Sequence, residues 1–214
     1  MKNTKQQPYT VGEEIGNSVS HGIMALVCLC GIAPVAIHAY LKNGALAATG
    51  TTIFMISLFM MFAASALYHS SAFDSKHRQV LQILDHIFIY FAIAGTYTPI
   101  CLSVIGGWLG ITVVIIQWII VIFGILHNSL AKQKVPKVSL AIYLVMGWSI
   151  VIIAPMFLRK AELGLQLMVL AGGAFYSIGT YFYAKKDKIF YHTVWHFFVN
   201  LGAVSHFLGI LLFM

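Results

Sequence analysis

The amino-acid sequence predicts an all-α membrane protein, a bundle of seven transmembrane helices in a single domain over residues 1–214. Two observations lead to this fold class: 60% of the 214 residues are hydrophobic and only 9% are charged. Soluble domains carry about 25% charged residues, so a chain this apolar must have lipid as its main solvent. The third observation is that long apolar runs alternate with short polar breaks, as in a chain that crosses a bilayer repeatedly.

Seven apolar runs are long enough to span a membrane, because a helix needs about 20 residues to cross the hydrocarbon core. A β-barrel is excluded, since these runs are continuously apolar and do not alternate. The first run is too long for the apolar region of a cleavable signal and is interpreted as a retained span. The predicted spans lie near residues 18–41, 46–70, 82–102, 108–127, 138–158, 163–184 and 190–213.

The basic residues predict the orientation of the chain. Seven spans place ten of the 13 Lys and Arg on the side of the N-terminus and leave three on the other side, Lys42, Arg159 and Lys160. Positive residues stay on the cytoplasmic side, so the N-terminus is predicted in the cytosol and the C-terminus outside. A cytosolic N-terminus argues against an ordinary G-protein-coupled receptor, whose N-terminus faces outward. The ten residues on the cytosolic side are Lys2, Lys5, Lys76, Arg78, Lys132, Lys134, Lys137, Lys185, Lys186 and Lys188.

The net charge of +7 is interpreted as a record of this topology. We therefore expect membrane lipids as partners and no nucleic acid, and we predict no soluble protein partner. The sequence leaves the oligomeric state open.

Ionisable side chains inside spans are costly, so each one is a functional candidate. They form four clusters: Glu13-Glu14 with Asn17 and His21, Ser65 to His69, Asp85-His86, and His192 to His196. In the predicted topology all four clusters fall at the same depth, near the cytosolic face. Chance would scatter them over both leaflets, so this coincidence indicates one site.

Three histidines of these clusters predict a zinc site. His192 and His196 are four residues apart, so on a helix both imidazoles project from one face. His69 is the third candidate ligand, which would leave a fourth position open for water. Asp85 could hold that position through water or act as a general base, and Ser65, one turn before His69, could bind a substrate or water.

The plainer alternative is that each histidine packs between helices and forms a hydrogen bond across the bundle. His86 is expected to pack or to support the site, and His206 lies deeper and could bond a neighbouring helix. Gly172 and Gly179 suit close helix contact. The segment from Thr96 to Pro99 could open its span locally.

These residues resemble the hemolysin III family, the bacterial branch of the progestin and adipoQ receptor (PAQR) superfamily, over essentially the whole chain. The resemblance rests on Glu14 to Asn17 with His21, Ser65-Ala66-Leu67-Tyr68-His69, Asp85-His86 and His192-Thr193-Val194-Trp195-His196. It implies a multi-pass protein of the bacterial cytoplasmic membrane. It also implies a zinc ion near the cytosolic side, with the metal histidines falling on His69, His192 and His196 and the family's serine and aspartate on Ser65 and Asp85.

The resemblance leaves several functions open. The superfamily is similar to the alkaline ceramidases, so a zinc-dependent hydrolase of lipid amides or esters with a part in membrane lipid homeostasis is the first. The second is a non-enzymatic sensor or regulator of the membrane with a structural zinc. The third is cytolysis, although the residues predict no pore. A proton or ion transporter is disfavoured, because a relay needs stations across the bilayer.

Overall fold

The computed structural model describes residues 9–73, 75–130, 136–185 and 188–214. Every regular element within these ranges is a helix, so the all-α class predicted from the sequence is confirmed. The elements are α1 (Val11–Ser70), α2 (Lys76–Pro99), the π-helix η1 (Ile100–Ile105), α3 (Gly107–Leu130), α4 (Pro136–Trp148), the 3₁₀-helix η2 (Ser149–Ile153), α5 (Ala154–Lys160), α6 (Leu163–Ala184) and α7 (Tyr191–Phe213).

Six helical stretches of the described chain are long and apolar enough to cross a membrane. They are α1, α2 with η1, α3, the stretch Val138–Lys160, α6 and α7. Their outer surfaces are rich in exposed large apolar side chains, which is the expected surface of a protein whose solvent is lipid.

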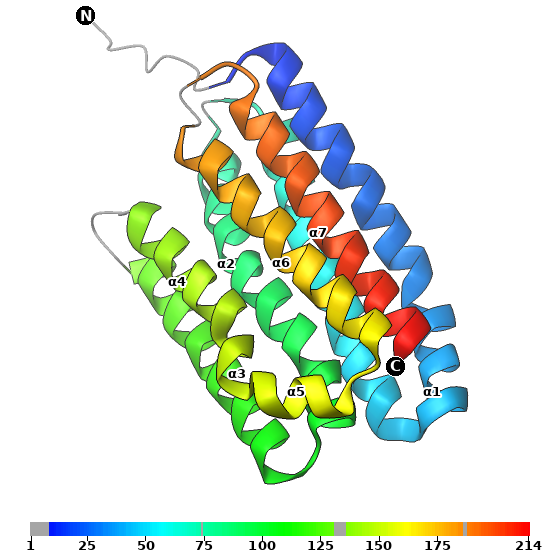
Figure 1. Ribbon diagram of the computed structural model, residues 1–214. Coiled ribbons are helices and arrows are strands. Elements are labelled where there is room, and N and C mark those ends of the chain that lie inside the picture. The colour runs from blue at the N-terminus through cyan, green and yellow to red at the C-terminus, as the bar shows by residue number, and fades with distance from the viewer. Residues whose placement is uncertain (1–8, 74, 131–135, 186–187) are drawn as a thin grey trace, which may run out of the picture.

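The helix α1 folds back on itself. Its 60 residues would extend about three times the thickness of the hydrocarbon core if they were straight. Gly44 interrupts it with φ 80° and ψ −172°, a left-handed φ that favours glycine. The two arms then lie side by side, and the Ser18 hydroxyl donates to the Ala66 carbonyl at 3.1 Å. Figure 1 shows the blue arm running down the bundle and the cyan arm returning.

Two helices begin earlier than the sequence predicts. α1 starts at Val11 and not near residue 18, because Thr10 and Glu13 form a reciprocal capping box at its first turn. α2 starts at Lys76 and not near residue 82, with the Ser75 hydroxyl as its cap. Hydropathy marks the lipid-embedded part of a helix, so polar first turns that continue it lie outside the predicted span.

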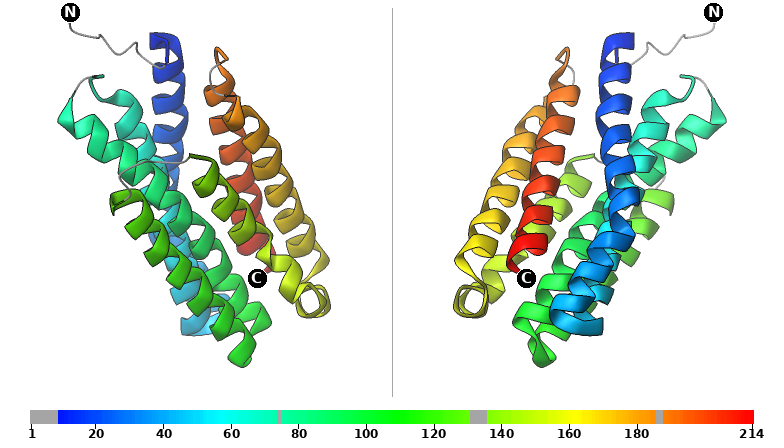
Figure 2. Two further views of the ribbon diagram at one scale, coloured as in Figure 1. Left: turned by 90° about the vertical axis from the view of Figure 1, so that its left-hand side faces the viewer. Right: turned by 90° about the vertical axis from the view of Figure 1, so that its right-hand side faces the viewer.

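The helices α6 and α7 form one side of the bundle, and α2 with α3 forms the other (Figure 2). Contact between α6 and α7 depends on glycine, as predicted: a Cβ at Gly172 would lie 2.3 Å from the His206 ring, and one at Gly179 would lie 2.8 Å from Trp195. The helix α5 lies across the end of the bundle between α4 and α6. The predicted opening at Thr96–Pro99 corresponds to the switch from α2 into the π-helix.

Candidate metal centre

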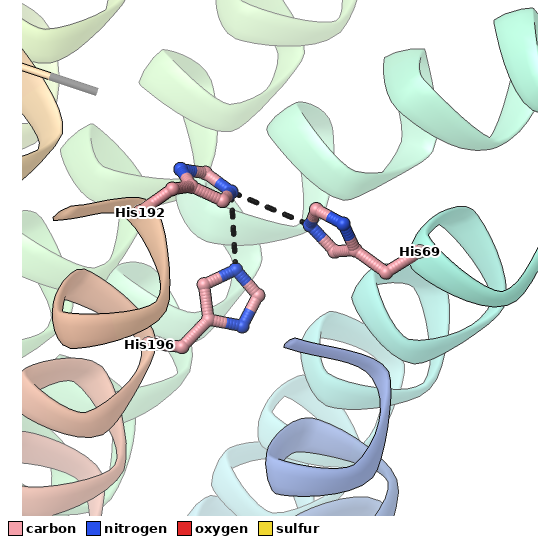
Figure 3. A group of neighbouring side chains, drawn as sticks. All are labelled: His69, His192 and His196. Carbon is pink, nitrogen blue, oxygen red and sulfur yellow. Dashed lines mark hydrogen bonds between the residues drawn. The ribbon is translucent and has the colours of Figure 1, made fainter. Parts of the chain in front are cut away.

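The three predicted ligand histidines lie together although 123 residues separate His69 from His192 in the sequence. His69 is in the last turn of α1, and His192 and His196 occupy the first two turns of α7. All three are buried, with exposed fractions of 3%, 6% and 2%. Their rings converge on one point, as Figure 3 shows. One ring nitrogen of each lies within 4.8 Å of the others, so the three histidines could hold a metal ion.

The two nitrogen–nitrogen distances from His192 match those in a tetrahedral site. His192 Nε2 lies 3.3 Å from His69 Nε2 and 3.2 Å from His196 Nε2 (Figure 3). Nitrogen ligands about 2.0–2.1 Å from a tetrahedral zinc ion lie about 3.3–3.4 Å from one another. These two spacings are those of imidazole ligands of one ion, and the third pair, between His69 and His196, lies within 4.8 Å.

Hydrogen bonding alone accounts poorly for this arrangement. Each nitrogen of a neutral imidazole carries either one proton or one lone pair in the ring plane. His192 Nε2, however, has two nitrogen neighbours at hydrogen-bond distance. It can satisfy one of them and would repel the other, whereas a cation between the three lone pairs would satisfy them all.

The far side of the His69 ring faces polar groups of the first arm of α1. Its Nδ1 is held by Glu14 Oε2 at 2.6 Å, and the side-chain amide of Asn17 lies nearby at 3.5 Å. The other carboxylate oxygen of Glu14 accepts a hydrogen bond from Arg78. Arg78 is 6% exposed. The sequence interpretation counted Arg78 only as a charge on the cytosolic side and did not predict that it is buried against Glu14 in the first turn of α2.

Two aromatic rings cover the histidines. Tyr9 stacks on His192 with ring centroids 4.7 Å apart, and His21 stacks on His196 at 3.8 Å. Burial raises the pKa of the Tyr9 hydroxyl, so this group stays neutral. His21 belongs to a predicted cluster, but sequence reasoning missed Tyr9, because it precedes the first apolar run in a polar segment.

The other predicted site residues share a cavity with two of the candidate ligands, His192 and His196. The cavity has a volume of about 400 Å³, and its wall includes Ser65, Asp85, His192 and His196. Ser65 is 2% exposed. Asp85 Oδ2 lies 4.0 Å from His86 Nδ1, within reach of a weak ion pair. The structure thus groups these side chains around one space, and the roles of Ser65 and Asp85 stay predictions.

The remaining lining of the cavity is mainly aliphatic and aromatic and extends away from the histidines. It includes Ile89, Leu144 and Leu170 from α2, α4 and α6, and Phe157 of α5. His206 also lines it and lies 3.2 Å from the Val169 carbonyl, which confirms the predicted bond to a neighbouring helix.

Comparison with known proteins identifies the family to which this chain belongs. The family described as Haemolysin-III related matches residues 9–207. The chain belongs to this family. The match includes all five predicted site residues, and it confirms the resemblance seen in the sequence.

Individual relatives of this Haemolysin-III-related protein agree with the assignment. A protein named Hemolysin-3 homolog from Bacillus subtilis (strain 168) is 35% identical over 206 residues, which cover 96% of each chain. Hemolysin-3 from Bacillus cereus is 36% identical over 205 residues, covering 95% of this chain and 93% of that protein. The human Monocyte to macrophage differentiation factor is 29% identical over 164 residues, covering 74% of this chain and 67% of the human protein.

The family and the six apolar helices together make this a multi-pass membrane protein. Its bacterial relatives indicate the bacterial cell membrane.

Proposed function

We propose that this Haemolysin-III-related protein is a zinc-dependent hydrolase that cleaves amide or ester bonds of membrane lipids and contributes to lipid homeostasis. One observation carries the proposal: three buried imidazoles converge at ligand spacing, and two of them form part of the wall of an apolar cavity. A structural metal has no need of such a space, whereas a catalytic metal keeps one position open to its substrate.

The cavity suits a lipid substrate. The aliphatic side chains of α2, α4 and α6 match the hydrocarbon chain of a lipid, so a chain that enters from the bilayer exchanges one apolar environment for another without a desolvation cost. The polar groups gather where the histidines lie, so the carbonyl of an amide or ester would lie there and the chain would extend toward α5.

Each polar residue of the cavity wall has its own role in the proposed reaction. The imidazoles of His69, His192 and His196 would hold the zinc ion, which would supply a Lewis acid that makes water nucleophilic near neutral pH. The Asp85 carboxylate accepts the proton that the attacking water loses and later delivers it to the leaving group. The Ser65 hydroxyl donates a hydrogen bond to the carbonyl oxygen of the substrate.

We also propose that the chain crosses the membrane seven times, with the N-terminus in the cytosol. The reversal at Gly44 supports this count, because each arm of α1 matches one predicted span. The orientation is supported by the distribution of basic residues. Of these, Lys2, Lys5, Lys132, Lys134 and Lys186 lie outside the described residues, as does the Lys137 side chain. This topology would put the metal centre near the cytosolic face.

The test is hydrolysis by the purified protein reconstituted in lipid vesicles. We expect zinc-dependent release of fatty acid from at least one lipid amide or ester in a broad panel. Asp85→Ala should keep its zinc and lose this activity. A wild-type protein that retains zinc and releases no fatty acid, together with unchanged cellular lipids in a strain carrying Asp85→Ala, would exclude the hydrolase.

A membrane sensor or regulator with a structural zinc is the second candidate. It is favoured by the positions of the histidines, because an ion there would fasten the second arm of α1 to α7. In that case His192→Ala costs stability, and no lipid turnover exists to be lost. Measuring zinc affinity and lipid hydrolysis on the same samples separates the two functions.

Cytolysis is suggested by the names of the two Bacillus relatives. The apolar lining of the cavity gives no support to a water-filled pore, which needs a polar lumen. Red cells exposed to the purified protein should therefore stay intact, and dose-dependent release of haemoglobin would revive this function.

A further inference from the structure

Glu14 joins the candidate ligand His69 to a buried cation. One oxygen of its carboxylate lies 2.6 Å from His69 Nδ1, and the other accepts a hydrogen bond from the Arg78 guanidinium. The side chain of His69 is 0% exposed and that of Glu14 is 10% exposed. A carboxylate in such a place needs charge and hydrogen-bond partners, and these two contacts supply them.

The first contact determines which nitrogen of His69 faces the other histidines. An ionised carboxylate only accepts hydrogen bonds, so His69 Nδ1 carries the proton and donates to Glu14. A neutral imidazole has only one N–H, and here that group donates to Glu14, so Nε2 keeps its lone pair. It is this Nε2 that lies 3.3 Å from His192 Nε2. Glu14 therefore selects the tautomer of His69 that can bind a metal.

The second contact explains why a charged carboxylate can stay there. Arg78 binds Glu14 with one arm of its guanidinium and donates with Nη1 to the Ser71 and Tyr68 carbonyls, at 2.7 and 3.2 Å. These carbonyls belong to the end of α1, on both sides of His69 in the sequence. Arg78 thus neutralises the carboxylate and fixes the backbone that carries the histidine.

We infer that Glu14 and Arg78 form a positioning pair for His69, which sets the tautomer and the direction of this ligand and so raises the affinity of the site for its metal. The inference rests on the proposed zinc site and concerns affinity rather than turnover. Carboxylates that hold metal-binding histidines raise metal affinity about 10–100-fold in other proteins.

Glu14→Gln tests the pair, because it removes the charge and keeps the shape. Glu13→Gln is the matched control: Glu13 is the neighbouring carboxylate, and it accepts hydrogen bonds from Thr10 and from the Phe190 backbone N–H at 2.7 Å. Zinc affinity is measured on the full chain in detergent by competition with a chelator. We expect Glu14→Gln to weaken zinc binding about 10–100-fold, and Glu13→Gln to weaken it clearly less. Equal effects of the two changes, or wild-type affinity in Glu14→Gln, would overturn the inference.

A second readout separates this inference from the zinc site itself. Nitrogen-15 NMR of the metal-free protein reports which nitrogen of His69 is protonated. We expect Nδ1–H in the wild type and in Glu13→Gln, and a mixture of both tautomers in Glu14→Gln. A wild-type protein that shows Nδ1–H and binds no zinc would refute the proposed function and leave the role of Glu14 in selecting the tautomer intact. An Nε2–H tautomer in the wild type would refute the inference.

The arginine is tested in combination, because a lone buried charge could prevent folding. Arg78→Met leaves Glu14 without its cation, whereas the double change Glu14→Gln and Arg78→Met leaves no unpaired charge. We expect the double variant to fold and to bind zinc more tightly than Arg78→Met alone. If the double variant loses as much zinc affinity as the two single variants lose together, the residues act independently, and this result would contradict a pair.

Discussion

His192 lies between the other two candidate ligands, because its Nε2 approaches the Nε2 atoms of both His69 and His196. The neighbouring residues divide into those that hold the ligands and those that face the cavity. Glu14 belongs to the first group, and Ser65 and Asp85 belong to the second. Changes in the first group should alter metal affinity, and changes in the second should alter chemistry while the metal stays bound.

Ser65→Ala tests this division on the cavity side. Removal of one hydrogen-bond donor to a developing oxyanion costs about 10²–10³ in turnover, so we expect a loss of about that size with unchanged zinc content. Ser57→Ala is the control, because Ser57 is an equally buried serine of α1, 2% exposed, and lies two turns away. Equal activity in the two variants would exclude Ser65 from catalysis.

The candidate ligand histidines could be found from the sequence because two of them are one helical turn apart and the third lies at the same predicted depth. Arg78 and Tyr9 could not be found in this way. Both stand in polar segments where a basic or aromatic residue is usually interfacial, and only the folding of α1 against the start of α2 and α7 brings them inward.

At the level of helices, the packing of α6 against α7 fixes the helix that carries two of the three candidate ligands. Gly172 is critical for this packing, because any Cβ there would overlap the His206 ring and lie 3.1 Å from the Gly202 carbonyl. Gly173, its neighbour, has only the Trp148 ring within reach, at 3.9 Å.

Gly172→Val should therefore destabilise the protein by about 1–3 kcal/mol through overpacking, and Gly173→Val should cost much less. Thermal unfolding in detergent, followed by circular dichroism, measures both. If Gly173→Val were as damaging as Gly172→Val, loss of helix flexibility and not close packing would be the cause.

The apolar runs predicted the helices well within the bilayer and poorly at their ends. The break at Lys42–Gly44 was predicted because polar and glycine residues interrupt an apolar run, and the structure confirms it. The starts of α1 and α2 were predicted too late, since caps such as Thr10 and Ser75 act in polar segments that hydropathy assigns to loops.

At the level of the whole molecule, the candidate metal centre joins the second arm of α1 to the last helix, α7. An ion that binds only the folded state stabilises it, by about 2.7 kcal/mol when its free concentration is 100 times the dissociation constant. Chelation should therefore lower the unfolding temperature of the wild type and leave that of His196→Ala unchanged. Equal unfolding temperatures of the wild type with and without chelator would argue against a bound ion.

The seven-crossing topology predicts on which side each loop lies. In a background without Cys28, Cys30 and Cys101, a membrane-impermeant thiol reagent should label Glu162→Cys in intact cells. It should label His77→Cys only after permeabilisation. Both positions are exposed in the structure. Labelling of His77→Cys in intact cells would reverse the orientation and move the metal centre to the outer face.

The central claim is that His69, His192 and His196 bind one ion, and elemental analysis of the purified protein tests it most directly. The wild type and His206→Ala, a change on the same helix α7 outside the ligand set, should each hold about one zinc ion per chain. His69→Ala and His196→Ala should hold almost none while they remain helical. A folded wild-type protein that takes up no zinc, or a His196→Ala variant that keeps its full content, would contradict the account.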